Sequence, residues 1–74
     1  MNADILKGKW LQLRGDLKQA WGDLTDDELL QIEGNSDKLI RKLQEKYGYS
    51  RDRAEMEVDQ FRARMERKYS KDME

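Results

Sequence analysis

Apolar residues recur every three or four positions along most of this chain, which is the spacing of one face of an α-helix. No stretch alternates apolar and polar residues with the period of two that marks a strand. Four stripes follow one another: Leu6, Trp10, Leu13, Leu17, Trp21 and Leu24; Leu29, Leu30 and Ile32; Leu39, Ile40, Leu43 and Tyr47; Ala54, Val58, Phe61 and Met65. Because short connections make neighbouring helices pack back on each other, the pattern predicts an all-α fold, a small up-and-down helical bundle of three longer helices plus one short helix.

The chain has no proline, so the helix boundaries must come from capping residues and glycines. Thr25 and Glu28 have the spacing of a capping box, which predicts the start of the short helix. The other expected N-caps are Asn2 or Asp4, Asn35 or Ser36, and Ser50. The expected C-terminal stops are Gly22, Gly34 and Gly48. Residues 71–74 are expected to fray at the end of the last helix.

The composition excludes several kinds of functional site but does not identify a function. The 74 residues suffice for one domain, which is expected to span 1–74. Charged residues (42%) outnumber hydrophobic ones (36%), so the hydrophobic core is small. Without cysteine or histidine the chain lacks disulfides, thiolate ligands and the commonest general base, and no catalytic residue, metal or cofactor is expected. No segment has the apolar length of a signal peptide or a membrane span, which predicts a cytoplasmic protein that does not enter the membrane.

Two groups of residues have a functional interpretation that is weaker than a structural one. The acidic residues Asp26, Asp27, Glu28 and Glu33 could form a cation site, but the calcium-loop spacing is absent, and acids in a first helical turn stabilise the helix dipole. Trp10 and Trp21 share one helical face and could form a platform for a nucleobase or a partner. The leucines between them on that face favour burial in the core instead.

Two sets of basic residues are candidate contacts for anions or nucleic acid. On the predicted third helix these are Lys38, Arg41, Lys42 and Lys46, although lysine stems also cover core edges while the ammonium stays in water. On the fourth helix the pairs Arg51–Glu55, Arg53–Glu57 and Arg62–Glu66 have stabilising spacing. The less compensated cations there are Arg62, Arg64, Arg67, Lys68 and Lys71. The net charge of −1 argues against a nucleic-acid-binding domain, so nucleic acid is the less favoured partner.

Glycines at positions 8, 15 and 22 lie along one line of the predicted first helix. A glycine inside a helix costs about 0.5–1 kcal/mol relative to alanine, so Gly8 and Gly15 call for a reason. Close approach of another backbone, from this chain or from a partner, is one reason, and a soft helix is another. Gly8, Leu11 and Gly15 are therefore the candidate partner contact, through which self-association remains open.

Several short motifs together resemble the CsbD-like family of small bacterial stress-response proteins. They are Trp10, Gly15 and Lys18; Trp21-Gly22-x-Leu24-Thr25-Asp26-Asp27; Ile32-Glu33-Gly34; Asp37, Leu39 and Gln44; Tyr47-Gly48-Tyr49; and Ala54, Glu55, Glu57 and Val58. The resemblance implies a small cytoplasmic helical bundle made in quantity under general stress, and it carries over no catalytic or binding residue. The leading interpretation is a non-catalytic protein that acts by binding or protection. The alternatives are a weak, salt-sensitive nucleic-acid-binding protein and a homo-oligomeric or adaptor module.

Overall fold

The structure, a computed structural model, describes residues 5–70. It contains five helices and, in that range, no strand: α1 Ile5–Gly8, α2 Trp10–Ala20, α3 Asp26–Ile32, α4 Ser36–Tyr47 and α5 Arg51–Ser70. The small all-α fold is confirmed. The caps expected at Asn2 or Asp4 and the fraying expected at 71–74 lie outside the described residues.

The prediction of one continuous first helix is wrong. Lys9 departs from helical geometry (φ −124°, ψ 29°) and separates the short α1 from α2. The apolar stripe did not reveal this break because Leu6 and Trp10, on either side of it, are both buried in the same core. α2 ends at Ala20, with Trp21 as its C-cap and Gly22 in the turn that follows. The first stripe therefore forms two helices, and the chain has one helix more than predicted.

The other boundaries follow the local signals. Thr25 and Glu28 form the predicted capping box, with Thr25 Oγ1 accepting from the Glu28 amide at 3.1 Å and Glu28 Oε1 accepting from the Thr25 amide at 2.9 Å. Asn35, and not Ser36, caps α4 through a 3.0 Å bond from the amide of Lys38. The predicted cap at Ser50 is confirmed, because its hydroxyl accepts from the amide of Arg53 at 3.1 Å.

Two left-handed residues end α3 and α4. Gly48 closes α4 as predicted, with φ +69°. At the end of α3 the left-handed C-cap is Glu33 (φ +52°), and Gly34 follows it with φ +78°. The C-cap of α3 is therefore Glu33, one residue before the predicted stop at Gly34.

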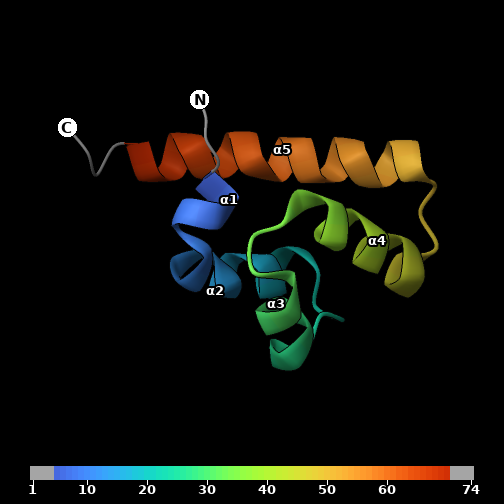
Figure 1. Cartoon of the computed structure of the whole chain (residues 1–74). Coiled ribbons are helices and arrows are strands. Elements are labelled where there is room, and N and C mark those ends of the chain that lie inside the picture. Colours follow the sequence, from blue (N-terminus) through green and yellow to red (C-terminus); the bar gives the residue numbers. More distant parts are fainter. Residues whose placement is uncertain (1–4, 71–74) are drawn as a thin grey trace.

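α5 is the longest helix and runs along one side of the molecule (Figure 1). α4 packs beneath the half of α5 that begins at Arg51, α1 packs against the other half, and α3 packs on α4 away from α5 (Figure 1). No helix in the described range combines the length and the apolar composition needed to cross a membrane.

All five helices contribute to one apolar core or its edge. Its buried residues are Leu6, Trp10, Leu13, Leu17, Trp21, Leu24, Leu29, Ile32, Leu39, Ile40, Leu43, Ala54, Val58, Phe61 and Met65. No polar or charged side chain is buried within the described residues. Leu30, which the pattern placed on the second stripe, is instead 51% exposed, because α3 is short and presents only one narrow face to the core.

Candidate functional site

The predicted basic stripe lies on α4. The apolar face of this helix is buried, so Lys38, Arg41, Lys42 and Lys46 are placed on the faces that remain. The N-cap at Asn35 fixes where the helix starts, and the left-handed Gly48 fixes where it ends. The structure therefore brings these four cations together on one helix, as the sequence predicted.

Lys42 and Lys46 are largely neutralised within the fold. The Lys46 ammonium lies 3.0 Å from Glu28 Oε2 and donates to the carbonyl of Asp23 at 3.2 Å. Lys42 lies 3.2 Å from Glu45 and 3.9 Å from Glu28. The pKa of Glu28 is lowered, first by the hydrogen bond from the Thr25 amide and then by the bond from Lys46. These two lysines thus join α4 to α3 and to the loop before it.

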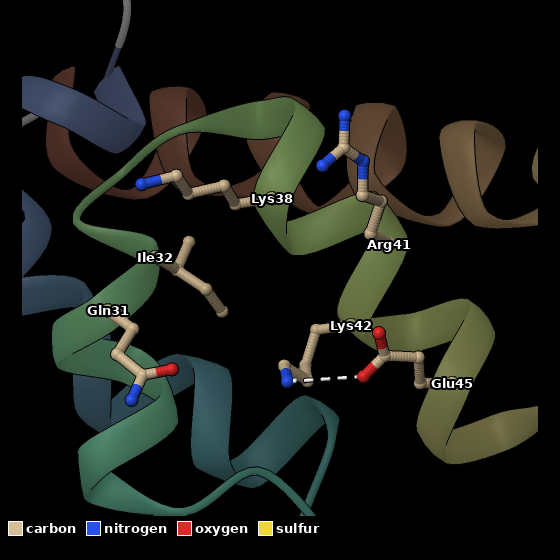
Figure 2. A pocket seen from close by; sticks show the side chains of 6 residues that line it. All are labelled: Gln31, Ile32, Lys38, Arg41, Lys42 and Glu45. Carbon is tan, nitrogen blue, oxygen red and sulfur yellow. Dashed lines mark hydrogen bonds and ion pairs between the residues drawn. The ribbon is translucent and has the colours of Figure 1, made fainter.

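Lys38 and Arg41 differ from their neighbours on the stripe. Both side chains are exposed, and among residues 5–70 no carboxylate lies within ion-pair distance of either. They line an open pocket of about 240 Å³ between α3 and α4, together with Gln31, Ile32, Lys42 and Glu45. Figure 2 shows the side chains of both helices around this pocket. The uncompensated positive charge of the stripe is therefore concentrated at this pocket.

The cations near the end of α5 do not form a free patch. Arg62 lies 3.8 Å from Asp59, the Arg64 guanidinium lies 5.9 Å from the centre of the Phe61 ring, and the Lys68 ammonium lies 2.8 Å from Asp16. Arg67 also has an interaction of its own. Lys71 lies outside the described residues. Of the predicted pairs, Arg51–Glu55 (2.9 Å) and Arg53–Glu57 (3.6 Å) are present.

Asp16 joins α2 to the end of α5, which the sequence did not reveal. It accepts hydrogen bonds from the Lys68 ammonium at 2.8 Å and from the Tyr69 hydroxyl at 2.9 Å. Burial alone would raise the pKa of Asp16, but the bonds from Lys68 and Tyr69 and the charge of Lys68 together lower it below its ordinary 3.8. The 52-residue separation of Asp16 and Lys68 leaves no local signal for this contact.

We expect acid pH to weaken this contact. Because the folded-state pKa of Asp16 is lowered, its stabilisation is complete above the ordinary value of 3.8 and is lost as the pH falls through the lower folded-state pKa. Asp16→Asn should cost about 1 kcal/mol at neutral pH. In urea unfolding followed by circular dichroism, the free energy of unfolding should fall less between about pH 7 and pH 3 in the variant than in the wild type. An equal fall in both proteins would contradict this assignment.

The two tryptophans belong to the core. Trp10 is 7% and Trp21 4% exposed, so neither offers an exposed platform. The Trp10 indole donates to the carbonyl of Leu29 at 2.8 Å, and the Trp21 ring lies 5.3 Å from the Phe61 ring, tilted by 48°. The core interpretation, which the sequence favoured, is therefore confirmed.

Two of the four acidic residues, Asp26 and Glu28, have structural partners. Asp26 pairs with Lys18 at 2.8 Å, and Glu28 completes the capping box. Within the described residues no group of three or more carboxylates is placed to hold a metal ion. Tyr47, on the Tyr-Gly-Tyr motif, accepts from the amide of Asp23 at 3.1 Å, so it ties the loop before α3 to the end of α4.

Gly8, Leu11 and Gly15 lie on an open surface. A Cβ added at Gly8 or Gly15 would have no neighbour within 4 Å, and Leu11 is 73% exposed. Within residues 5–70, no other part of this chain packs closely on these glycines, contrary to that interpretation. A partner contact there stays a prediction. The close backbone approach occurs instead at Gly34, where an added Cβ would lie 2.7 Å from the carbonyl oxygen of Leu6 and from the Cα of Lys7.

The chain is similar to proteins from several bacteria. It is 54% identical over 65 residues to a UPF0337 protein of Pseudomonas aeruginosa, covering 88% of this chain and all of that protein. It is 56% identical over 61 residues to a UPF0337 protein of Xanthomonas axonopodis pv. citri, covering 82% and 88% of the two chains. The UPF0337 protein YjbJ of Escherichia coli (strain K12) is 48% identical over 66 residues, with 89% and 96% covered. The model of the CsbD-like family matches residues 4–56. The chain therefore belongs to the CsbD-like family.

Proposed function

We propose that this protein is a non-catalytic, cytoplasmic general stress-response protein that acts by binding or by protecting other molecules. The stress-response role rests on the family resemblance. The structural observation that supports it is the separation of apolar and charged residues, because every buried side chain within residues 5–70 is apolar. An acid–base or nucleophilic site needs ionisable groups whose pKa is tuned by burial, and this core offers them no place.

The surface suits a protein that survives unfolding without aggregating. Within residues 5–70, the large exposed apolar side chains are Leu11, Leu30 and Met56, and they belong to three different helices. Charged residues make up 42% of the sequence. The helix-weakening glycines at 8 and 15 have no packing role in the fold, so the chain has features of a helical protein that unfolds and refolds readily.

The test is reversibility of thermal unfolding. Heating through the transition and cooling should restore the full far-UV circular dichroism signal without light scattering, because the high fraction of charged residues (42%) keeps the unfolded chain solvated. The matched control is Arg53→Leu/Glu57→Leu, which replaces an ion pair between an exposed arginine and a half-buried glutamate, leaves the net charge unchanged and adds apolar surface on α5. The control should aggregate more on heating. Irreversible precipitation of the wild type would contradict the protective role.

Self-association through α1 and α2 is the second candidate. It is favoured by the exposure of Leu11 beside two glycines that this chain's own packing does not require. A mass that stays monomeric at high concentration in sedimentation equilibrium would exclude it. The nucleic-acid alternative is weakened, since Lys42, Lys46 and Lys68 are each paired with carboxylates.

A further inference from the structure

We propose that the pocket between α3 and α4 binds a short chain of phosphates, such as tripolyphosphate or the phosphate tail of a nucleotide, through Lys38 and Arg41. This inference deepens the proposed function, on which it rests, because it names a ligand class for a protein that acts by binding. Its test addresses the residues of the pocket, so it can be carried out separately from the test of reversible unfolding.

The described residues of this chain do not balance the positive charge of the pocket. Three cations and one carboxylate line it, and Lys42 accounts for that carboxylate through its 3.2 Å contact with Glu45. Lys38 and Arg41 are left without a counter-charge among residues 5–70. Guanidinium and ammonium groups are the side chains that bind phosphate, with bonds stronger than those between neutral groups. An anion therefore complements this part of the surface.

The shape of the pocket favours a small, extended anion. Its volume is about 240 Å³, and Ile32, which is only 2% exposed, closes it on the side of the core. Gln31 contributes an amide that can donate to an oxygen. Figure 2 shows the Lys38 ammonium on the side of the loop between the helices and the Arg41 guanidinium on the side facing α5. Since the two cations stand at different edges in Figure 2, an extended chain of phosphates suits the pair better than a single compact phosphate.

Glu45 sets the affinity of the pocket. Its carboxylate repels an incoming anion and occupies the Lys42 ammonium. The Glu45 side chain is 66% exposed, so its pair with Lys42 is easily exchanged for a better one. Removing this carboxylate leaves Lys42 with the longer 3.9 Å contact to Glu28, so Lys42 should become more available to the anion as a third cation.

The experiment is an NMR titration of backbone amides with sodium tripolyphosphate at low salt. In the wild type, the amides of residues 31–45 should shift. Lys38→Gln/Arg41→Gln should weaken binding at least about tenfold, because two charge-assisted contacts are lost. The matched control, Lys18→Gln/Arg53→Gln, removes the same charge from exposed, carboxylate-paired residues on α2 and α5 and should change affinity by less than about twofold.

A second pair of variants tests the role of Glu45. Glu45→Gln should strengthen tripolyphosphate binding several-fold, whereas Glu57→Gln, which removes the carboxylate that pairs with Arg53 on α5, should not. Adenosine triphosphate should shift the same amides as tripolyphosphate, and orthophosphate should bind more weakly than either. A nucleotide that binds more tightly than tripolyphosphate assigns the natural source of the phosphates to nucleotides, and the reverse order assigns it to free oligophosphate.

Several outcomes would overturn the proposal: no shifts in residues 31–45, equal weakening in both double variants, or orthophosphate binding as tightly as tripolyphosphate. A short DNA duplex that binds more tightly and also shifts the amides of α5 would replace the pocket by a nucleic-acid interface. Reversible melting without tripolyphosphate binding would remove this inference and leave the proposed function standing. Tripolyphosphate binding combined with irreversible melting would remove the protective role and leave the anion pocket standing.

Discussion

Replacing Phe61 by alanine is expected to unfold most of the protein under conditions in which the wild type is folded. Phe61 is 1% exposed at the middle of α5, and its ring packs on Trp21 from the end of α2. Truncation of a buried phenylalanine costs about 3–5 kcal/mol, since the transfer free energy of the removed atoms is lost and the cavity left behind adds a further cost. A domain of this length has a total stability of about 4–11 kcal/mol, so the loss is a large part of it.

Urea unfolding followed by circular dichroism measures this loss, and tryptophan fluorescence reports the same transition through Trp21. The control is Met56→Ala on the same helix, where the side chain is 53% exposed. It should change the free energy of unfolding by no more than about 0.5 kcal/mol. Similar costs for the two variants would mean that the apolar face of α5 has been assigned incorrectly.

The buried residues of α4 and α5 could be predicted from the sequence because the helical spacing of apolar residues indicates which face of a helix contacts the core. Phe61 and Val58 were expected inside on spacing alone, and both are buried. Helix starts were predictable for a related reason. The hydrogen bonds of Thr25, Asn35 and Ser50 reach only three residues along the chain, so the residues that make them are visible in the sequence.

Contacts between distant segments could not be predicted in this way. The indole of Trp10 bonds to the carbonyl of Leu29, 19 residues away, and Asp16 meets Lys68 across 52 residues. The break at Lys9 has no proline and no capping residue, and its local signal, Gly8 at the end of α1, was outweighed by the continuous apolar stripe. Each of these features depends on how the helices are arranged, whereas the pattern of apolar residues reports only which face of each helix is buried.

The candidate site also has a part that the sequence predicts and a part that depends on the tertiary structure. Its four cations were predictable because they share α4, but which of them are neutralised was not. Lys46 meets Glu28 and the carbonyl of Asp23 only because α3 and the loop before it pack on α4. Lys38 and Arg41 remain uncompensated because the described part of the fold brings no carboxylate to them. The sequence thus predicts a basic stripe, and the tertiary structure reduces it to a pocket.

Gly34→Ala is expected to destabilise the protein by about 2–4 kcal/mol, from a left-handed backbone conformation and a steric clash together. Gly34 has φ +78°, and a Cβ there would lie 2.7 Å from backbone atoms of Leu6 and Lys7 on α1. Neither atom belongs to a flexible side chain that could move aside. Relief of the clash requires α1 to separate from the end of α3. Thermal unfolding should show a midpoint lowered by roughly 10 °C or more.

Two other glycines separate the causes of this effect. Gly48 has φ +69° but open space around it, so Gly48→Ala should cost only the conformational part, about 1 kcal/mol. Gly15 is helical with nothing within 4 Å, so Gly15→Ala should stabilise the protein by about 0.5–1 kcal/mol. If Gly34→Ala costs no more than Gly48→Ala, the close contact with α1 is not present in solution. If Gly15→Ala stabilises, packing within the described part of this chain gives no reason for a glycine at that position, which leaves a partner contact beside Leu11 or a helix that unfolds readily.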